Sequence, residues 1–567
     1  MKKKVLPVII IIALILFIGA IYVAPQLYEK ISYGTEWADL ESYFGVNGDS
    51  DVPIILQNEL IEEHALLADG YYYMDFASVQ KYLNDRFYVG EEDGILVYTT
   101  PTAIITTTIG TSDWSDTEGN SGTESYQITG YEGDTLYVAL EYVKKYTNFS
   151  YEGYSDPNHM QLTTEWNEQT VATIKKDTEL RIRGGIKSEI LEDIHKGDEV
   201  IILEEMETWT KVKTADSFIG YVENKRLSDK ETVTPEAVND YQEPEYTSIS
   251  KDYTINMGFH GVGGQSGNDT LESLVANATS LNTVSPTWFT LSDNEGGIRS
   301  YASQSYVTKA HELGLEVWAL VDNFTGPEGI ETGTILSHAS SRANLINNLI
   351  NEAVTYGIDG INVDFEMVAS ENGQDFIEFI RELSIACRAQ QLVLSVDNYV
   401  PMNFNDYYDL EEQGIVADYV LIMGYDEHYA GSTEAGSVAS ISYVKNGIAD
   451  TVAEVDPSKV INAIPFYTRI WKTSASGVTS EAVTMEIANN WVASHNVELT
   501  WNDEAGQYYG EYTDSDGTLC QVWMEDAESI ETKLSVMSTY NIAGVAEWKL
   551  GFETSDIWPI IANYVNK

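Results

Sequence analysis

The chain has 567 residues and a formal net charge of −57, because 89 acidic residues stand against 32 basic ones. This length exceeds what one hydrophobic core usually fills, about 250 to 300 residues, so we expect several domains. The acidic residues are spread along the chain and would repel polyanions, which argues against nucleic acid or an anionic membrane surface as the main ligand. The charge fits an enzyme that works on a neutral or mixed-charge polymer, or a surface charge that only maintains solubility.

The amino terminus predicts a membrane anchor within residues 1–28. Three lysines at positions 2–4 precede the uncharged run from Val5 to Ala24. Twenty helical residues span roughly 30 Å, the thickness of a bilayer core. Small residues of the kind that mark a cleavage site are not found at the end of this run, so we expect an uncleaved helix. Because lysines stay on the cytoplasmic side, the bulk of the chain is expected to be extracellular, in a single-pass cell-membrane protein.

Only two cysteines occur, Cys387 and Cys520. They are too few for a disulfide framework and lack the spacing of metal ligands, so neither a metal nor another cofactor is predicted. One disulfide between them is an open alternative. We expect Cys387 to be a buried free thiol, because it continues an apolar helical stripe.

Residues 35–168 contain a faint internal repeat. The segment Asp69-Gly-Tyr-Tyr-Tyr73 and the segment Gly133-Asp-Thr-Leu-Tyr137 each begin a unit that reads as a strand, a short helix and a strand pair. This duplicated α+β pattern resembles the small domain named after the N-terminal domain of copper amine oxidases. The resemblance implies no copper, since this region has no cluster of His, Cys and Met residues.

Residues 170–228 read as a run of short strands with closely spaced turns, which predicts a small β-barrel. Lys196-Gly-Asp198, Trp209 and Gly220-Tyr-Val222 resemble a bacterial SH3 domain. That resemblance implies wall-peptide binding, although Trp209 is equally compatible with a core position. The polar stretch 229–250 is predicted to be a linker.

From about residue 251 to 567, apolar β-rich runs alternate with helical stretches. Eight such runs predict an α/β fold of the (β/α)8 TIM-barrel type, whose active site lies at the carboxyl ends of the strands. The expected strands are Tyr253–Phe259, Thr283–Phe289, Glu316–Leu320, Gly360–Phe365, Val393–Val396, Tyr419–Met423, Val460–Pro465 and Gly544–Trp548.

The fourth of these strands carries the chemistry. Side chains alternate between the two faces of a strand, so Asn362, Asp364 and Glu366 share one face, and the apolar residues between them share the other. Burying unpaired carboxylates is expensive. We therefore expect the polar trio to face the barrel lumen as a catalytic group.

The segment Asp359-Gly-Ile-Asn-Val-Asp-Phe-Glu366 resembles the D-G-x-D-x-D-x-E motif of family 18 glycoside hydrolases. Met423-Gly-Tyr-Asp426, Pro465-Phe-Tyr-Thr-Arg469 and Trp548 are similar to the family's segments on the sixth, seventh and eighth strands. Ser285-Pro-Thr-Trp288 and the order of the small domains resemble the bacterial cell-wall and spore-lytic branch. The resemblance implies substrate contacts for Asp359, Asn362, Met423, Asp426, Trp548, Tyr467, Arg469 and Trp288.

By the same resemblance, Glu366 is the proton donor and the 2-acetamido oxygen of the substrate is the nucleophile. Asp364 would orient the acetamido group, and the hydroxyl of Tyr425 would donate a hydrogen bond to its carbonyl. Asp364 lies roughly 6.6 Å from Glu366 along the strand, too near to activate a water on the opposite side of the sugar. Trp548 would stack beneath the distorted sugar.

One motif position departs from the pattern, since residue 362 is Asn where chitinases usually have Asp. Asp364 is therefore expected to lack a carboxylate neighbour there and to be less easily protonated at rest. Other residues near strand ends are expected either to line a groove or to pack in the core, namely Asp322, Asn323, Asn398 and Tyr399. Trp491, Trp501, Tyr508 and Tyr509 lie in the longest gap between strands and are expected to form one wall of the cleft.

The sequence thus predicts a retaining, substrate-assisted glycoside hydrolase that cleaves β-1,4 bonds of N-acetylglucosamine-containing glycans. Peptidoglycan is the preferred substrate, because a tethered enzyme meets the wall first, and endo and exo action both stay open. A chitinase or a glycan endo-β-N-acetylglucosaminidase is the enzymatic alternative. A non-catalytic protein that binds cell-wall glycans is the alternative from another class, and the presence of Glu366 argues against it.

Overall fold

The computed structural model describes residues 5–237 and 241–566. Contacts divide the chain into two compact units. One takes in residues up to Arg86 together with Ile109–Asp113 and Gly122–Glu243, and the other takes in Phe87–Thr108, Trp114–Ser121 and the residues from Pro244 onward. Each unit is described in turn.

The larger unit contains the barrel. Eight parallel strands pair in a ring, closed by the pairing of β20 with both β21 and β33. All eight predicted strands are present, as β20 (Ile255–His260), β21 (Thr283–Leu291), β23 (Glu316–Asp322), β24 (Gly360–Asp364), β25 (Val393–Tyr399), β26 (Tyr419–Met423), β27 (Val460–Pro465) and β33 (Gly544–Trp548). The short strand β22 (Ile298–Ser300) pairs antiparallel with β21. The (β/α)8 prediction is confirmed.

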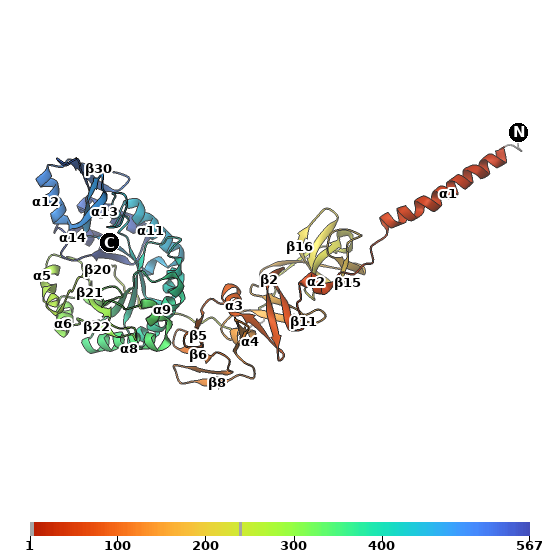
Figure 1. The fold of residues 1–567 in the computed structure, drawn as a ribbon, viewed down its shortest axis with the longest axis horizontal. Helices are drawn as coiled ribbons and strands as arrows, with labels where there is room; N and C mark the ends of the chain where they lie inside the picture. The colour runs from red at the N-terminus through yellow and green to blue at the C-terminus, as the bar shows by residue number, and fades with distance from the viewer. Residues whose placement is uncertain (1–4, 238–240, 567) are drawn as a thin grey trace. The chain divides into compact units, whose positions relative to one another are not determined.

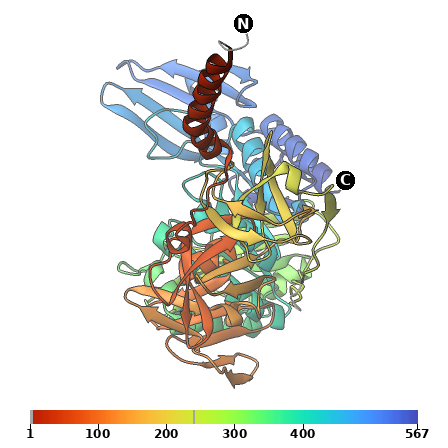
Figure 2. The ribbon, with the colours of Figure 1, turned by 90° about the vertical axis from the view of Figure 1, so that its right-hand side faces the viewer.

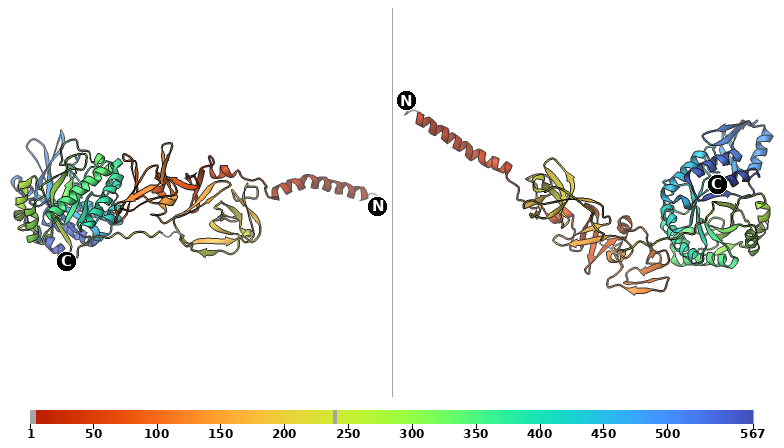
Figure 3. Two further views of the ribbon diagram at one scale, coloured as in Figure 1. Left: turned by 90° about the horizontal axis from the view of Figure 1, so that it is seen from below. Right: turned by 180° about the vertical axis from the view of Figure 1, so that it is seen from behind.

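Helices surround these strands, as Figures 1 and 3 show. They begin where short polar side chains cap the first turn: Ser303 and Ser440 accept from backbone N–H groups, and Asp526 forms a capping box with Ser529. The helices are α5 (Leu271–Val275), α6 (Gln304–Glu312), α7 (Thr332–Ser337), α8 (Ala339–Tyr356), α9 (Gly373–Ala389), α10 (Leu410–Val416), α11 (Ile441–Glu454), α13 (Ala527–Tyr540) and α14 (Trp558–Val565).

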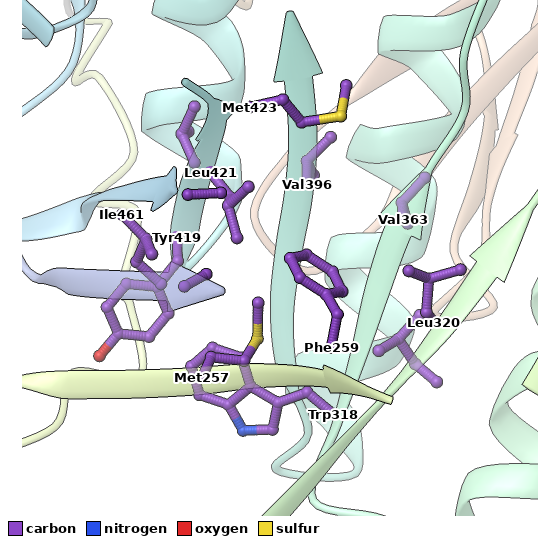
Figure 4. Packing of buried hydrophobic residues seen from close by; sticks show 14 of the residues in the cluster. Met257, Phe259, Trp318, Leu320, Val363, Val396, Tyr419, Leu421, Met423 and Ile461 are labelled. Carbon is purple, nitrogen blue, oxygen red and sulfur yellow. The ribbon is translucent and has the colours of Figure 1, made fainter. Parts of the chain in front are cut away.

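Large apolar side chains fill much of the barrel interior. Met257 and Phe259 come together there with residues of the neighbouring strands (Figure 4). Trp318 stacks on Tyr419 with ring centroids 5.3 Å apart. Gly360 is required beside this pair, because a Cβ at that position would lie 2.9 Å from the Trp318 ring. Polar groups in the barrel interior are thus concentrated toward the carboxyl ends of the strands.

Phe365 points the other way. It lies against α9, with its ring stacked on Phe379 at 5.5 Å. Cys387 is also buried on α9 as a free thiol, as predicted, and Cys520 is likewise buried and unpaired by a disulfide. The open alternative of a disulfide between them is wrong.

An α+β insertion separates β27 from β33. Its five-stranded sheet has the order β29-β28-β32-β31-β30, and its long strands are drawn in blue in Figure 2. Trp491 packs against His495 and Tyr512, and Trp501 packs against Tyr508. The elements are β28 (Tyr467–Ser474), β29 (Gly477–Thr484), α12 (Met485–His495), β30 (Leu499–Asn502), β31 (Gln507–Thr513) and β32 (Leu519–Trp523).

A second small sheet shares contacts with the barrel helices. Its strands are β4 (Phe87–Gly90), β5 (Ile95–Thr99), β6 (Ile104–Thr108), β7 (Asp113–Asp116) and β8 (Ser121–Thr123). Tyr88 donates to Asp375 at 2.6 Å, and Thr99 donates to Glu378 of α9 at 2.5 Å. Part of the segment predicted as one domain, 35–168, therefore belongs to the compact unit of the barrel.

The smaller unit begins with the helix α1 (Val5–Ile31). Its stretch Val8–Ile31 has a mean hydropathy of 2.9 and is long and apolar enough to cross a membrane, by length and composition. The lysines at positions 2–4, on which the predicted orientation rests, lie outside the described residues. A short helix, α2 (Leu40–Phe44), follows.

Two seven-stranded sheets complete the smaller unit. The first has the order β11-β12-β1-β2-β3-β10-β9, and the second the order β15-β14-β18-β17-β16-β13-β19. Strand β19 lies inside the stretch predicted as a linker and pairs with β13. The elements of the first sheet are β1 (Asp51–Leu56), β2 (Glu59–Ala68), β3 (Tyr71–Asp75), α3 (Phe76–Tyr82), β9 (Thr129–Glu132), β10 (Thr135–Ala139), α4 (Leu140–Val143), β11 (Ser150–Tyr154) and β12 (His159–Thr163). Those of the second are β13 (Gln169–Thr173), β14 (Thr178–Arg181), β15 (Ile190–Ile194), β16 (Glu199–Glu205), β17 (Trp209–Lys213), β18 (Ile219–Glu223) and β19 (Glu231–Val233).

Candidate active site

The site lies at the carboxyl end of β24. Asp364 is the last residue of the strand and is 4% exposed, and Glu366 follows it, partly buried. Asp364 pairs in register with Asp322 of β23. Neighbouring strands thus bring carboxylates together at one end of the barrel, where a TIM barrel places its chemistry.

Two residues hold Glu366 in place. The Tyr399 hydroxyl donates to its Oε2 at 2.8 Å. The Asn323 side chain donates to the Glu366 carbonyl at 2.8 Å and accepts from its backbone N–H at 2.9 Å. Both belonged to the group predicted either to line a groove or to pack in the core, and both contact the glutamate itself.

Burial raises the pKa of Glu366 above its usual range, and the carboxylates of Asp426 and Asp322 raise it further. The hydrogen bond from Tyr399 favours the ionised form and opposes this shift. The environment therefore retains a proton on Glu366 to higher pH than water would, which suits a general acid.

Asp364 is surrounded by acids. Burial raises its pKa well above the usual range, and the charges of Asp397, Glu366 and Asp322 add to the shift. Tyr425, 8% exposed, lies in the same group, and burial together with Asp364 raises its pKa well above the usual range. Tyr425 is therefore a neutral hydroxyl that can donate.

The expectation that Asp364 lacks a carboxylate neighbour and is less easily protonated is wrong. Asn362 donates to Asp397 Oδ2 at 2.8 Å and accepts from the Ser395 hydroxyl, and so it places a second carboxylate beside Asp364 from the next strand. Strand β25 runs three residues beyond its predicted end. The alternation of Ser395, Asp397 and Tyr399 could have identified this inward face.

A cavity of about 500 Å³ opens beside these residues. Asp322, Asp364 and Trp548 contribute to its wall, and Trp548 is braced edge-on by Phe259 at 5.2 Å. The remaining lining residues are Gly261, Val262, Gly263, Thr287, Trp288, Phe289, Thr290, Arg299, Tyr301, Leu320, Phe324, Thr325 and Lys549. Trp491, Trp501, Tyr508 and Tyr509 do not belong to this lining. The volume falls within the range of small-molecule sites.

The other predicted substrate-contact residues lie at or after the carboxyl ends of β26 and β27. Met423 ends β26 and is 9% exposed. Tyr467 donates to Asp426 Oδ1 at 2.5 Å, which fixes the exposed carboxylate at the rim. Arg469 donates to Ser480 of the insertion at 2.9 Å.

Two predicted or considered residues, Asp359 and Asn398, are not brought to this site, whereas Trp288 reaches the cavity lining from a buried position. Asp359 precedes β24 at its other end, where it accepts from the backbone N–H of Val317 and contacts His311, both at 2.8 Å. Trp288 is 1% exposed, and its indole N–H donates to Asn268 at 2.8 Å. Asn398 is buried against Gln413.

A closed barrel with a buried acid cluster beside a glutamate of raised pKa is the architecture of a glycoside hydrolase. The family model "Glycosyl hydrolases family 18" matches residues 217–553, and the chain belongs to that family. Within the described residues, no group of three or more His, Cys, Asp or Glu side chains is arranged to hold a metal ion.

Similar proteins include bacterial glycosylases and a lytic enzyme. The putative sporulation-specific glycosylase YdhD of Bacillus subtilis is 30% identical over 223 residues, which cover 38% of this chain and 52% of that protein. The uncharacterized glycosylase YvbX of the same organism is 28% identical over 299 residues, which cover 51% of this chain and 86% of that protein. The cortical fragment-lytic enzyme of Bacillus anthracis is 25% identical over 237 residues, which cover 41% of this chain and 55% of that protein. The chain thus spans about half the length of YdhD and of the cortical enzyme.

Among solved structures, the C-terminal domain of a putative chitinase from Desulfitobacterium hafniense DCB-2 superposes with a TM-score of 0.50 at 22% identity. It covers 55% of this chain and 100% of that domain. At this identity the likeness concerns the fold alone.

Proposed function

We propose that this glycosidase cleaves β-1,4 bonds next to N-acetylglucosamine in peptidoglycan, with retention of configuration. The observation that carries the proposal is the state of Glu366, a carboxyl group with a raised pKa held by Tyr399 at the rim of the barrel. A glycosidic oxygen is a poor leaving group and needs such an acid.

The substrate itself supplies the nucleophile. Asp364 ends β24 and Glu366 follows two residues later, so both carboxyl groups approach the sugar from the same side, whereas the second carboxyl group of an inverting enzyme activates a water on the opposite face of the ring. The 2-acetamido oxygen attacks the anomeric carbon instead and the C1–O bond to the leaving group breaks. Glu366 gives its proton to the departing oxygen. Asp364 and the neutral Tyr425 hydroxyl hold the acetamido group.

The sugar lies on Trp548, whose flat face suits the C–H side of a pyranose. Met423, Asp426, Tyr467 and Arg469 support the other side of the site. Asn362 lies beneath the substrate and positions Asp397 through the hydrogen bond that its side chain donates. Asp359 is left out of these contacts because it lies at the other end of β24, and Trp288 contributes to the cavity wall.

Peptidoglycan is favoured over chitin by two considerations. Several similar proteins carry names that refer to sporulation or to the spore cortex, and a wall polymer is within reach of a membrane-anchored enzyme. We propose residues 1–28 as that anchor, with the bulk of the chain extracellular, and residues 170–228 as an SH3-like module that binds wall peptides. The preceding segment, 35–168, is proposed to derive from the duplicated amine-oxidase-type domain, and 229–250 to connect to the barrel unit.

The test incubates the chain without its first 31 residues with purified peptidoglycan, chitin oligosaccharides and N-glycans, and identifies the new reducing ends. We expect N-acetylglucosamine ends from peptidoglycan, formed first as the β-anomer, and a loss of at least about a thousandfold in Glu366→Gln. Substrates whose acetamido groups are replaced by free amines should not react, because they lack the nucleophile. Equal background release by wild type and Glu366→Gln from every substrate would support the binding-protein alternative.

A further inference from the structure

Asp364 and Asp397 form a buried pair of carboxyl groups with few other partners. Asp397 is 2% exposed and reaches the lumen from β25, one residue beyond Val396, which pairs with Val363. Asp364 Oδ1 and Asp397 Oδ1 are both buried without a hydrogen-bond partner among the described residues. The donor that Asn362 supplies satisfies only Oδ2 of Asp397.

Two such groups cannot both be ionised cheaply in a site this dry. The groups that face the pair are Asp322 from β23, Glu366 after β24, and Tyr425 after β26. None of these three is a cation, and the two cations of the neighbouring cavity, Arg299 and Lys549, form no ion pair with either aspartate within the described residues. We propose that Asp397 is the positioning residue that shares one proton with Asp364, and that it replaces the carboxylate absent from position 362.

This proposal rests on the substrate-assisted reaction above. At rest the proton lies between the two aspartates. When the acetamido oxygen bonds to C1, the acetamido N–H becomes positively charged; the shared proton moves fully to Asp397, and Asp364 meets the N–H as an anion. The proton returns when water opens the intermediate, so no proton is gained or lost by the pair.

The kinetic test uses three variants. Asp397→Asn keeps an acceptor for Asn362 but cannot hold the proton, and we expect kcat to fall at least tenfold with a displaced acidic limb of the pH profile. Asn362→Asp/Asp397→Asn returns a carboxylate to the neighbouring position and should recover most of kcat. Asn362→Asp alone is the control for adding an acid. If Asp397→Asn keeps the wild-type kcat and pH profile, or if the double variant is no better than the single one, the proposal is overturned.

A second measurement does not depend on activity. A carboxyl pKa raised in the folded state stabilises the fold below the unfolded pKa, and that stability is lost as pH rises through the folded pKa. Wild-type Tm should therefore decline as pH rises above the unfolded pKa of about 4, and more steeply than the Tm of Asp397→Asn. Parallel Tm curves would overturn the proton pair even if no substrate were cleaved, whereas an inactive wild type with diverging curves would count against the proposed function alone.

An independent observation concerns the cavity beside Asp364. In a chain of net charge −57, two cations line it, Arg299 and Lys549. Arg299 contacts the Thr325 carbonyl and the Tyr301 ring while its Nε is buried without a partner, and Lys549 lies over the Phe552 ring. Within the described part of the chain, neither forms an ion pair with a carboxylate.

We infer that Arg299 and Lys549 bind a carboxylate of the substrate. On peptidoglycan strands whose stem peptides have been removed, the lactyl ether of muramic acid carries such a group on the sugars that flank N-acetylglucosamine, whereas chitin carries none. A cation that faces a substrate carboxylate without a protein partner contributes to choice between substrates. The pair would thus favour peptide-free peptidoglycan strands over neutral oligosaccharides.

The test compares kcat/KM on soluble glycan strands with intact lactyl carboxylates and on strands whose carboxylates are reduced to alcohols. Wild type should prefer the intact strands, and Arg299→Gln/Lys549→Met should lose at least tenfold of that preference. An equal effect on both strands would mean that the cations only balance Asp322 and Asp364, and would overturn the inference. Calorimetric binding of both strands to Glu366→Gln, with and without the cation changes, gives the same comparison if turnover is absent.

Discussion

At the scale of single residues, the state of Glu366 depends on one hydroxyl. Tyr399 donates to its carboxylate and so favours the ionised form. Tyr399→Phe should therefore raise the pKa of Glu366 and move the basic limb of the kcat/KM profile to higher pH, since the acid stays protonated longer. A hydrogen bond to a charged group contributes about 1.5 kcal/mol or more, so kcat should fall about tenfold as the carboxyl loses its orientation.

Tyr407→Phe is the matched control. It removes the hydroxyl of Tyr407, which donates a hydrogen bond to the Val368 carbonyl at 2.9 Å. Its pH profile should coincide with that of wild type. A basic limb that moves to lower pH in Tyr399→Phe, or moves equally in both variants, would contradict the assigned role.

At the scale of elements, α9 couples the barrel to the small sheet that contains β4 and β5. Arg342 of α8 donates through Nη2 to Glu382 of α9 at 2.9 Å and through Nη1 to Tyr88 of β4 at 3.1 Å. Arg342 and Glu382 are both buried. Burial raises the pKa of Glu382 to about 7 even with the guanidinium opposing the shift. This carboxylate is therefore tolerated only because Arg342 is beside it.

Arg342→Met should destabilise the barrel unit by about 3 to 5 kcal/mol at pH 8, because it leaves Glu382 buried without its cation. The loss should shrink at pH 5, where Glu382 is protonated. Arg342→Met/Glu382→Gln should recover a large part of the stability, as measured by urea unfolding. A single variant within 1 kcal/mol of wild type at pH 8 would contradict this account of the contact.

The same elements show which parts of the structure a sequence can predict. Barrel strands buried on both faces appear as short apolar runs, and the alternation on β24 correctly separates Phe365 from Asp364. The same alternation places Asp397 on the inward face of β25, but its contact with Asn362 depends on the register between strands, which alternation does not give.

The scale of the whole molecule adds the question of where the enzyme works. Helix α1 exposes an uncharged, apolar run from Val8 to Ala24, within the stretch Val8–Ile31 of mean hydropathy 2.9. Such a helix inserted in a bilayer would anchor every later residue on one side, and the substrate would have to be a polymer within its reach.

The full chain should therefore sediment with membranes and resist extraction at high salt and alkaline pH, while a chain that begins at residue 32 should stay in the supernatant. Protease added to intact cells should remove the barrel from the full chain, because the proposed orientation places the bulk of the chain outside. Replacement of Leu14 and Ile18 by Lys should release the protein, since each charge at the bilayer centre costs about 2.5 to 3.5 kcal/mol. Replacement of Tyr28 by Lys, near the end of the helix, is the control and should not. If the protease can pass the cell wall and the barrel is still protected, the proposed orientation is contradicted. If the protein is found in the medium with a shortened amino terminus, the helix acts as a cleaved signal.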